Sequence, residues 1–169
     1  MNNKTKNILL IILFLAIIGM AIGYAALAQL LTINGTANIT ASWNIRIASI
    51  KEGTLNGATS KTAAVVNGDK LSASFDVNLQ YPGASATYIV TVENAGTINA
   101  TLESITGIDV ANALEPTEIT YSINAMENDR LDSGATKEYI VTVTWNDSNT
   151  IPSTTTKSAT ITLNYVQAV

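Results

Sequence analysis

The 169-residue chain contains no cysteine and no histidine. Without cysteine there is no disulfide framework, so the stability of the folded protein must come from packing and backbone pairing. Without histidine, Ser-His-Asp and Cys-His catalysis lack their base, and an H-E-x-x-H zinc site lacks its ligands. These absences predict a protein that is not an enzyme and that uses no cofactor.

Charged residues are also scarce, at 13% of the chain, whereas ordinary domains have about 25%. The formal net charge is −4, and all thirteen acidic residues follow residue 28. Nucleic-acid binding requires a basic face, so this balance predicts that the protein has no nucleic-acid partner.

A long uncharged apolar run opens the chain. Lys4 and Lys6 precede the stretch from Ile8 to Ala28, which is the order found in secretory signals. The run is also long enough to span a bilayer of about 30 Å, so residues 1–28 are either a cleaved signal peptide or an uncleaved membrane anchor. In both cases the basic end stays in the cytoplasm, so we expect the rest of the chain to be extracellular or at the cell surface.

A cleavage site lies at the end of this run, where Ala26, Leu27 and Ala28 form an A-x-A string before Gln29. Glycines and alanines toward the end of the run suit a processing enzyme better than a stable membrane span, which favours cleavage. We therefore predict that a signal peptidase is one partner, and that the chain is in the membrane before processing.

From Leu31 to Ile47, small or apolar residues occupy the odd positions and polar residues the even ones. A period of two indicates a strand with one buried face. These residues would span about 56 Å as a strand, far more than the usual strand of about 5–6 residues. The segment must therefore bend, change sheets or leave its own domain. We expect residues 29–40 to form an N-terminal strand, followed by a domain over residues 41–169.

Shorter alternating sets recur in residues 71–81, 119–123 and 159–165, with Gly- and Asn-containing turn sequences between the sets. Nothing after Ala28 has the period of an amphipathic helix. Regularly spaced short strands predict an all-β fold. The expected architecture is a single antiparallel β-sandwich of jelly-roll or Ig-like type that follows the N-terminal apolar helix.

One sequence pattern occurs twice. The string GASATYIVTV at residues 83–92 matches GATKEYIVTV at residues 134–143, fifty-one residues later. Separate domains of this length would each bury too little surface to be stable. The two strings are either equivalent strands of one domain, each entered through a glycine turn, or one favourable strand sequence used twice.

Several stretches carry a family resemblance: GYAAL at residues 23–27, LTINGTA at 31–37, WNIRI at 43–47 and YIVTVENAGTINA at 88–100. Together they resemble exported TasA/camelysin-type proteins of Gram-positive bacteria. The resemblance implies a jelly-roll-like or Ig-like sandwich, a dedicated signal peptidase of the SipW type, and surface or biofilm-matrix fibres. It also implies a metalloprotease, which the absence of histidine argues against. The Tyr-Phe-Ser-type signal ending of the best-known members is missing from this chain.

Glu127, Asp129 and Asp132 lie close together in a polar turn sequence. Carboxylate oxygens are suitable ligands for Ca²⁺, which makes these residues calcium candidates. However, the D-x-D-x-D-G spacing is absent, so we expect solvated side chains and no metal site. Asp147, in a second polar string, is interpreted in the same way.

Trp43 and Trp145 are the two tryptophans of the chain. Each is in phase with apolar neighbours on a strand-like stretch, so we expect both side chains to pack in the core rather than to form binding platforms.

Two functions fit these features. In the first, the protein is a subunit of a surface fibre, and its N-terminal strand is donated to the open sheet edge of a neighbour, giving head-to-tail self-association. The alternative is that the same residues form the domain's own first strand, bent at the Asn-Gly pair. The donor positions are Leu31, Ile33, Gly35, Ala37 and Ile39.

In the second function, the protein is a monomeric membrane-anchored or secreted binding or adhesion module. Recognition would then depend on the longest predicted loops, residues 106–117 and 146–156, because loops commonly carry recognition.

The N-terminus of the exported protein distinguishes cleavage from anchoring. We expect the mature chain to begin at Gln29, because the A-x-A string ends at residue 28. Intact-mass measurement of protein recovered from the cell surface checks this. A mass that still includes residue 1 would contradict cleavage.

Overall fold

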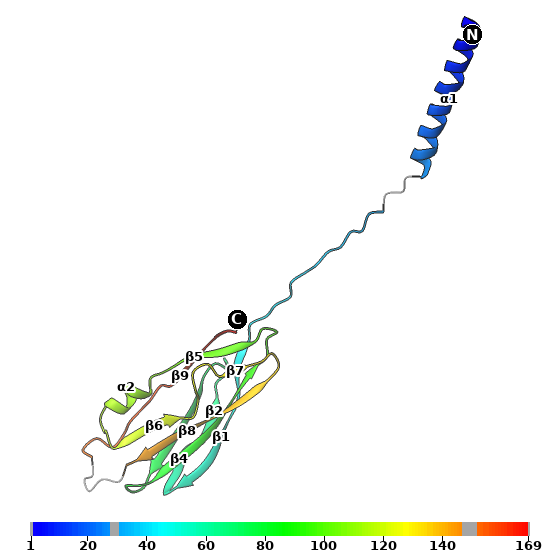
Figure 1. The fold of residues 1–169 in the computed structure, drawn as a ribbon. Coiled ribbons are helices and arrows are strands. Elements are labelled where there is room, and N and C mark those ends of the chain that lie inside the picture. Colours follow the sequence, from blue (N-terminus) through cyan, green and yellow to red (C-terminus); the bar gives the residue numbers. More distant parts are fainter. Residues whose placement is uncertain (1, 28–30, 147–151, 169) are drawn as a thin grey trace. The chain divides into compact units, whose positions relative to one another are not determined.

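The computed structural model describes residues 2–27, 31–146 and 152–168. The chain divides into two compact units, Met1–Ile39 and Thr40–Val169 (Figure 1). Among the described residues strands are more abundant than helices, and each described strand pair is antiparallel. The prediction of a mostly β chain with an N-terminal apolar helix is confirmed.

The first unit contains helix α1 (Asn3–Leu27). Residues Asn3–Ile22 are long and apolar enough to cross a membrane, and large side chains such as Leu10, Phe14 and Met20 are exposed. A helix that is apolar all round is stable only where lipid or another apolar surface covers it. Signal sequences and membrane anchors share this property.

Residues 31–44 contain neither helix nor strand and are exposed throughout. The strand that the alternation predicts over residues 29–40 is therefore not formed over residues 31–40, and residues 28–30 lie outside the described part. The alternative of the domain's own first strand is not observed either. The physical reason is that alternation specifies the face of a strand, whereas a strand forms only where a partner pairs with its backbone groups.

The domain begins where residues 42–44 pair with residues 95–97. The Ser42 carbonyl accepts a hydrogen bond from Thr97 N at 2.9 Å, and the Asn44 carbonyl accepts one from Ala95 N at 2.8 Å. Gly96 is suited to this close approach, because a Cβ atom there would collide with the Ser42 carbonyl oxygen. These contacts extend the backbone pairing of the domain's first strand to residues that precede its start.

A four-stranded sheet in the order β1-β4-β8-β6 forms one layer of the domain. Alternation is clearest in β4, where Ala86, Tyr88, Val92 and Asn94 are buried and Val90, on the same face, is partly buried. The four strands are β1 (Ile45–Asn56), β4 (Ser85–Asn94), β8 (Thr136–Trp145) and β6 (Ile119–Ile123).

Two smaller sheets complete the domain, one of two strands in the order β2-β3 and one of three strands in the order β7-β5-β9. Their strands are β2 (Ala58–Val66), β3 (Ala73–Leu79), β7 (Arg130–Leu131), β5 (Ala100–Thr106) and β9 (Thr162–Gln167).

A short helix, α2 (Ile108–Ala113), lies between β5 and β6. The expectation of no helix after Ala28 is therefore wrong at this position. Gly107, whose φ is 94°, comes directly before the helix, and the helix is only 6 residues long. Fewer than two turns are too short to show a helical period in the sequence.

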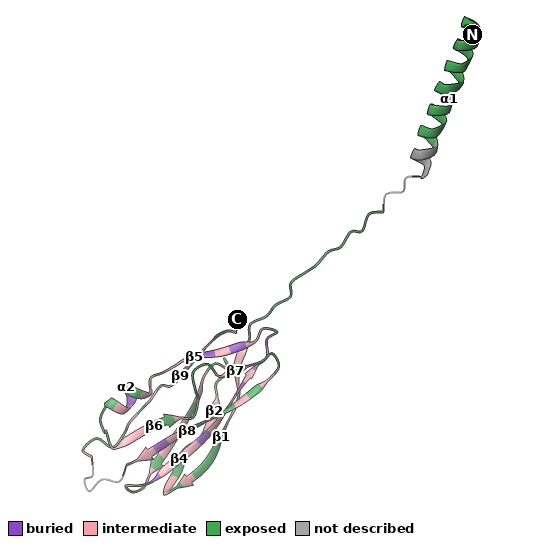
Figure 2. Ribbon diagram, viewed as in Figure 1, coloured by how far each residue is buried: buried purple, intermediate pink, exposed green. Residues whose placement is uncertain are grey.

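The buried core lies between the four-stranded and three-stranded sheets. Val92 and Tyr139 of the larger sheet pack with Ala100, Leu102 and Leu131 of the smaller one, and all five are at most 4% exposed. Figure 2 shows buried positions along β4, β8 and β5. The core is thus made by the inner faces of two sheets.

The repeated sequence pattern forms two adjacent strands, β4 and β8. Ile89 pairs with Ile140 at the centre, Tyr88 pairs with Val141, and Val90 pairs with Tyr139. The two strands are therefore related by a local two-fold axis, and both tyrosines are buried. Each strand follows a glycine with positive φ, 90° at residue 83 and 74° at residue 134. The interpretation as two equivalent strands of one domain, each entered through a glycine turn, is confirmed.

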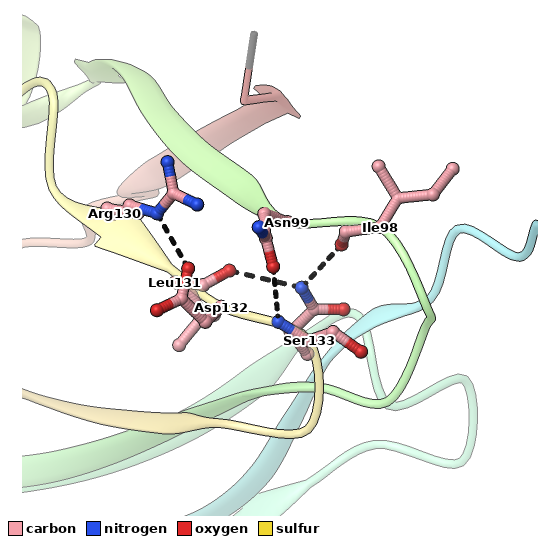
Figure 3. Close-up of polar contacts among 7 residues, drawn as sticks. Ile98, Asn99, Arg130, Leu131, Asp132 and Ser133 are labelled. Carbon is pink, nitrogen blue, oxygen red and sulfur yellow. Dashed lines mark hydrogen bonds and ion pairs between the residues drawn. The ribbon is translucent and has the colours of Figure 1, made fainter.

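Asn94 fixes the corner where β4 ends, and it is fully buried. Its Nδ2 atom donates to the carbonyls of Ile98 at 2.8 Å and Leu131 at 3.1 Å, and its Oδ1 accepts from Gly96 N at 3.0 Å. Beside it, Asn99 Oδ1 accepts from Ser133 N at 2.9 Å (Figure 3). The side chain of Asn94 thus replaces backbone pairing at a turn between two sheets.

Substitution Asn94→Ala should destabilise the domain by about 2–4 kcal/mol, because it leaves buried carbonyls and an amide without partners. Urea unfolding of the chain that begins at Gln29 measures this loss. Asn78→Ala is the matched control, since Asn78 is exposed on β3, and it should change the free energy of unfolding by less than about 0.5 kcal/mol. Equal effects of the two substitutions would contradict the assignment.

Candidate functional site

The inner face of the four-stranded sheet is only partly covered. A groove with an apolar floor and a cavity volume of about 970 Å³ runs over it. A second cavity of about 300 Å³ adjoins the first. The residues that line both are Lys61, Asp76, Val77, Tyr121, Thr156 and Lys157. The groove therefore extends from the Ile45 end of the sheet to its Trp145 end. Its floor is formed by Ile45, Ile47, Ile50, Val90, Val92, Tyr121, Ile123 and Val141.

The sides of the groove come from different sheets. One side is β3, and the other consists of residues 156–165, which lead into β9. No residue of β5 or β7 lines the groove, and β2 contributes Lys61 alone. In the described chain, β3 pairs with β2 and β9 pairs with β5. The second edges of β3 and β9 therefore border the groove without a partner strand.

The β3 side has one polar and one apolar face. Phe75 and Val77 are partly buried in the groove, whereas Ser74, at its margin, and Asn78 are exposed. The ring of Phe75 stacks on that of Tyr88 with a centroid distance of 4.0 Å, which anchors β3 to the larger sheet. The unpaired edge of β3 thus presents backbone groups above an apolar floor.

The β9 side alternates in the same way. Lys157, Ala159, Ile161, Leu163 and Tyr165 are partly buried, while the residues between them are exposed. The Tyr165 hydroxyl lies 2.7 Å from that of Tyr139. Burial and this hydrogen bond raise the pKa of Tyr165, so both tyrosines stay neutral and hold β9 to the core. Among the described residues, no backbone–backbone hydrogen bond involves residues 153–161.

Lys157 holds this segment in place. Its Nζ atom donates to the carbonyls of Ile119 at 2.7 Å, Pro116 at 3.0 Å and Asn112 at 3.3 Å. The Tyr121 hydroxyl in turn donates to the Lys157 carbonyl at 2.9 Å. Burial lowers the pKa of Lys157, while Glu115 and Glu118 act in the opposite direction. One side chain therefore ties the β9 side to α2 and β6.

The predicted donor positions lie in the first unit, outside any strand. Leu31 is 88% exposed, Ile33 is 96% exposed and Ile39 is 95% exposed. Gly35 and Ala37 are exposed between them. These apolar side chains are exposed to water, and they would lie on one face if the segment became a strand.

Trp43 was expected in the core, and this expectation is wrong. Its side chain is 46% exposed and lies at the margin of the groove, because the strand begins only at Ile45. Trp145 is partly buried and lines the second cavity. Its indole nitrogen is buried and has no hydrogen-bond partner among the described residues.

Two of the three calcium candidates form ion pairs. Asp129 forms an ion pair with Lys137 at 2.7 Å, and Asp132 forms one with Arg130 at 2.6 Å. Glu127 is exposed. In the part of the chain that the structure describes, no group of acidic side chains is arranged to hold a metal ion. Asp147 lies outside that part.

The predicted cleavage residues are only partly described. Ala26 is in α1, whereas Ala28 and Gln29 lie outside the described residues. Neither the groove nor the role of Lys157 was predicted from the sequence. The sequence offered one indication, which is that Lys157 is the one charged residue between residues 148 and 169.

No family model, curated protein or solved structure matched the chain.

Lys157→Met should lower the free energy of unfolding by about 2 kcal/mol, because three partly buried carbonyls lose a charged donor. Lys61→Met is the matched control. Its partner Asp76 is 46% exposed and the pair spans 3.1 Å, so the expected loss is below about 1 kcal/mol. Urea unfolding measures both. A loss for Lys157→Met no larger than that for Lys61→Met would contradict the anchoring role.

Proposed function

We propose that this protein is an extracellular structural protein of TasA/camelysin kind, a subunit of a surface or biofilm-matrix fibre. In this proposal residues 29–40 of one copy insert into the groove of the next copy. The domain would be a jelly-roll or Ig-like sandwich whose second layer lacks one strand between β3 and β9.

The observation that carries the proposal is the pair of unpartnered strand edges beside an apolar floor. An added strand would satisfy backbone groups on both edges and would place alternate side chains on the floor. β3 is 7 residues long, so a strand such as residues 31–39 has enough length to pair along it. A small-molecule ligand would use the apolar floor but not the backbone edges.

The donor segment has the composition that this position requires. Leu31, Ile33 and Ile39 would face the floor, and the polar residues between them would face solvent, as Ser74 and Asn78 do on β3. Donor and acceptor are different surfaces of the chain. Such a contact is heterologous and leaves a free donor and a free groove at the two ends, so repetition gives an open filament.

Export and assembly are linked in this proposal. While α1 remains attached, each donor segment is tethered to the membrane, and a signal peptidase would release it by cutting before Gln29. The low charge and the absence of histidine are consistent with a structural rather than a catalytic role.

The test uses two variants of the mature chain. Ile33→Asp would place a carboxylate on the apolar floor, at a cost of about 3 kcal/mol or roughly a hundredfold in affinity. Ala159→Arg would place a charge inside the groove. Each variant alone should be monomeric. Their equimolar mixture should form dimers that grow no further, because one competent donor meets one competent groove. Light scattering after size-exclusion chromatography and negative-stain microscopy measure this.

Two matched controls carry the same charges on exposed positions that should not meet the groove floor. Thr32→Asp and Thr154→Arg should form fibres like the unmodified chain. Fibres of Ile33→Asp would contradict strand insertion. A monomeric unmodified mature chain at all concentrations would favour the alternative, a binding or adhesion module.

A further inference from the structure

Asparagine followed by glycine is the sequence most prone to spontaneous deamidation. The backbone nitrogen of the glycine attacks Cγ of the asparagine, the side-chain nitrogen leaves as ammonia, and a cyclic succinimide forms. Water then opens the ring to aspartate or isoaspartate. Glycine favours the attack because it has no side chain to hinder it and its backbone rotates freely. The chain contains three such pairs, at residues 34–35, 56–57 and 67–68.

Two of the pairs are held by the fold. Asn56 is the last residue of β1 and pairs with Ser85, and the Gly57 carbonyl accepts a hydrogen bond from Gln80 N at 3.0 Å. Asn67 N donates to the Ser72 carbonyl at 2.9 Å, and its side-chain Nδ2 donates to Ser72 Oγ at 2.8 Å. Ring closure at either pair requires local opening of these contacts.

The third pair, Asn34-Gly35, has none of these restraints. Both residues are exposed and outside any helix or strand. No atom lies within 4 Å of the position that a Cβ would take on Gly35. Among the described residues, Asn34 makes no hydrogen bond. The backbone nitrogen of Gly35 is thus free to turn toward Cγ of Asn34.

We propose that Asn34-Gly35 is a site of spontaneous deamidation that inactivates donor segments that have not been inserted, a consequence that rests on the proposed function. Isoaspartate places an additional carbon atom in the main chain. The pleat then changes phase at residue 34, so Ile33 and Ile39 no longer lie on one face. Insertion into a neighbour's groove pairs the backbone and protects the site. Old unassembled chains are in this way excluded from fibres.

The experiment compares the three pairs within one sample. Mature protein recovered from the cell surface is incubated at mildly alkaline pH, in monomeric and fibrous form, and digested. Peptide mass spectrometry with an isoaspartate-specific methyltransferase then measures conversion. In the monomer, Asn34 should convert at least about tenfold faster than Asn56 or Asn67, because their conversion requires local unfolding. In fibres its rate should fall toward theirs.

Asn34→Gln is the matched variant, because it keeps an amide at an outward position and cyclises slowly. Aged unmodified monomer should lose the ability to assemble, whereas aged Asn34→Gln should keep it. Equal conversion of all three pairs would overturn the modification site. Rapid conversion with unchanged assembly would overturn the inactivation. If fresh protein fails to assemble, the fibre proposal fails, and the peptide measurement still decides the chemistry.

Discussion

In the described domain β3 and β9 each have one edge without a partner strand, and the apolar face of the larger sheet between these two edges is only partly covered. Two kinds of groups therefore lie at one place: backbone groups without hydrogen-bond partners in the domain, and apolar side chains that are only partly covered. A single added strand would pair with the backbone groups and cover the apolar side chains. In the proposed assembly the groove accepts this strand, the exposed N-terminal segment supplies it, and Lys157 holds one side of the groove in place.

The same constraint separates what the sequence predicts from what it does not. Alternation identified the strands around Phe75, Ile123 and Leu163, because a half-buried strand shows its period in its own residues. The duplicated Tyr-Ile-Val-Thr-Val string even indicated two equivalent strands, now seen as the β4–β8 pair. These are local properties, so a single chain reveals them.

Pairing partners are a different matter, because they depend on residues far apart in the chain. Residues 31–40 alternate as clearly as any strand, yet they form none, because no described strand pairs with them. The period of a sequence does not say where a partner lies. For the same reason Trp43 was expected in the core and is half exposed. The groove could not be predicted, because it depends on which two edges the topology leaves open. The role of Lys157 could not be predicted either, because its three acceptors come from residues 112–119.

The way in which the chain enters the domain has a mechanical consequence. Ser42 and Asn44 are hydrogen-bonded to residues 95–97, in continuation of the antiparallel β1–β4 ladder. A pull on the N-terminal segment along the strand axis therefore acts parallel to β1 and strains many hydrogen bonds in shear at the same time. Bonds that share a force in this way resist rupture far better than bonds that open one after another. A domain that is loaded through its N-terminal segment would therefore resist unfolding in shear, and its β1–β4 hydrogen bonds would not open one after another.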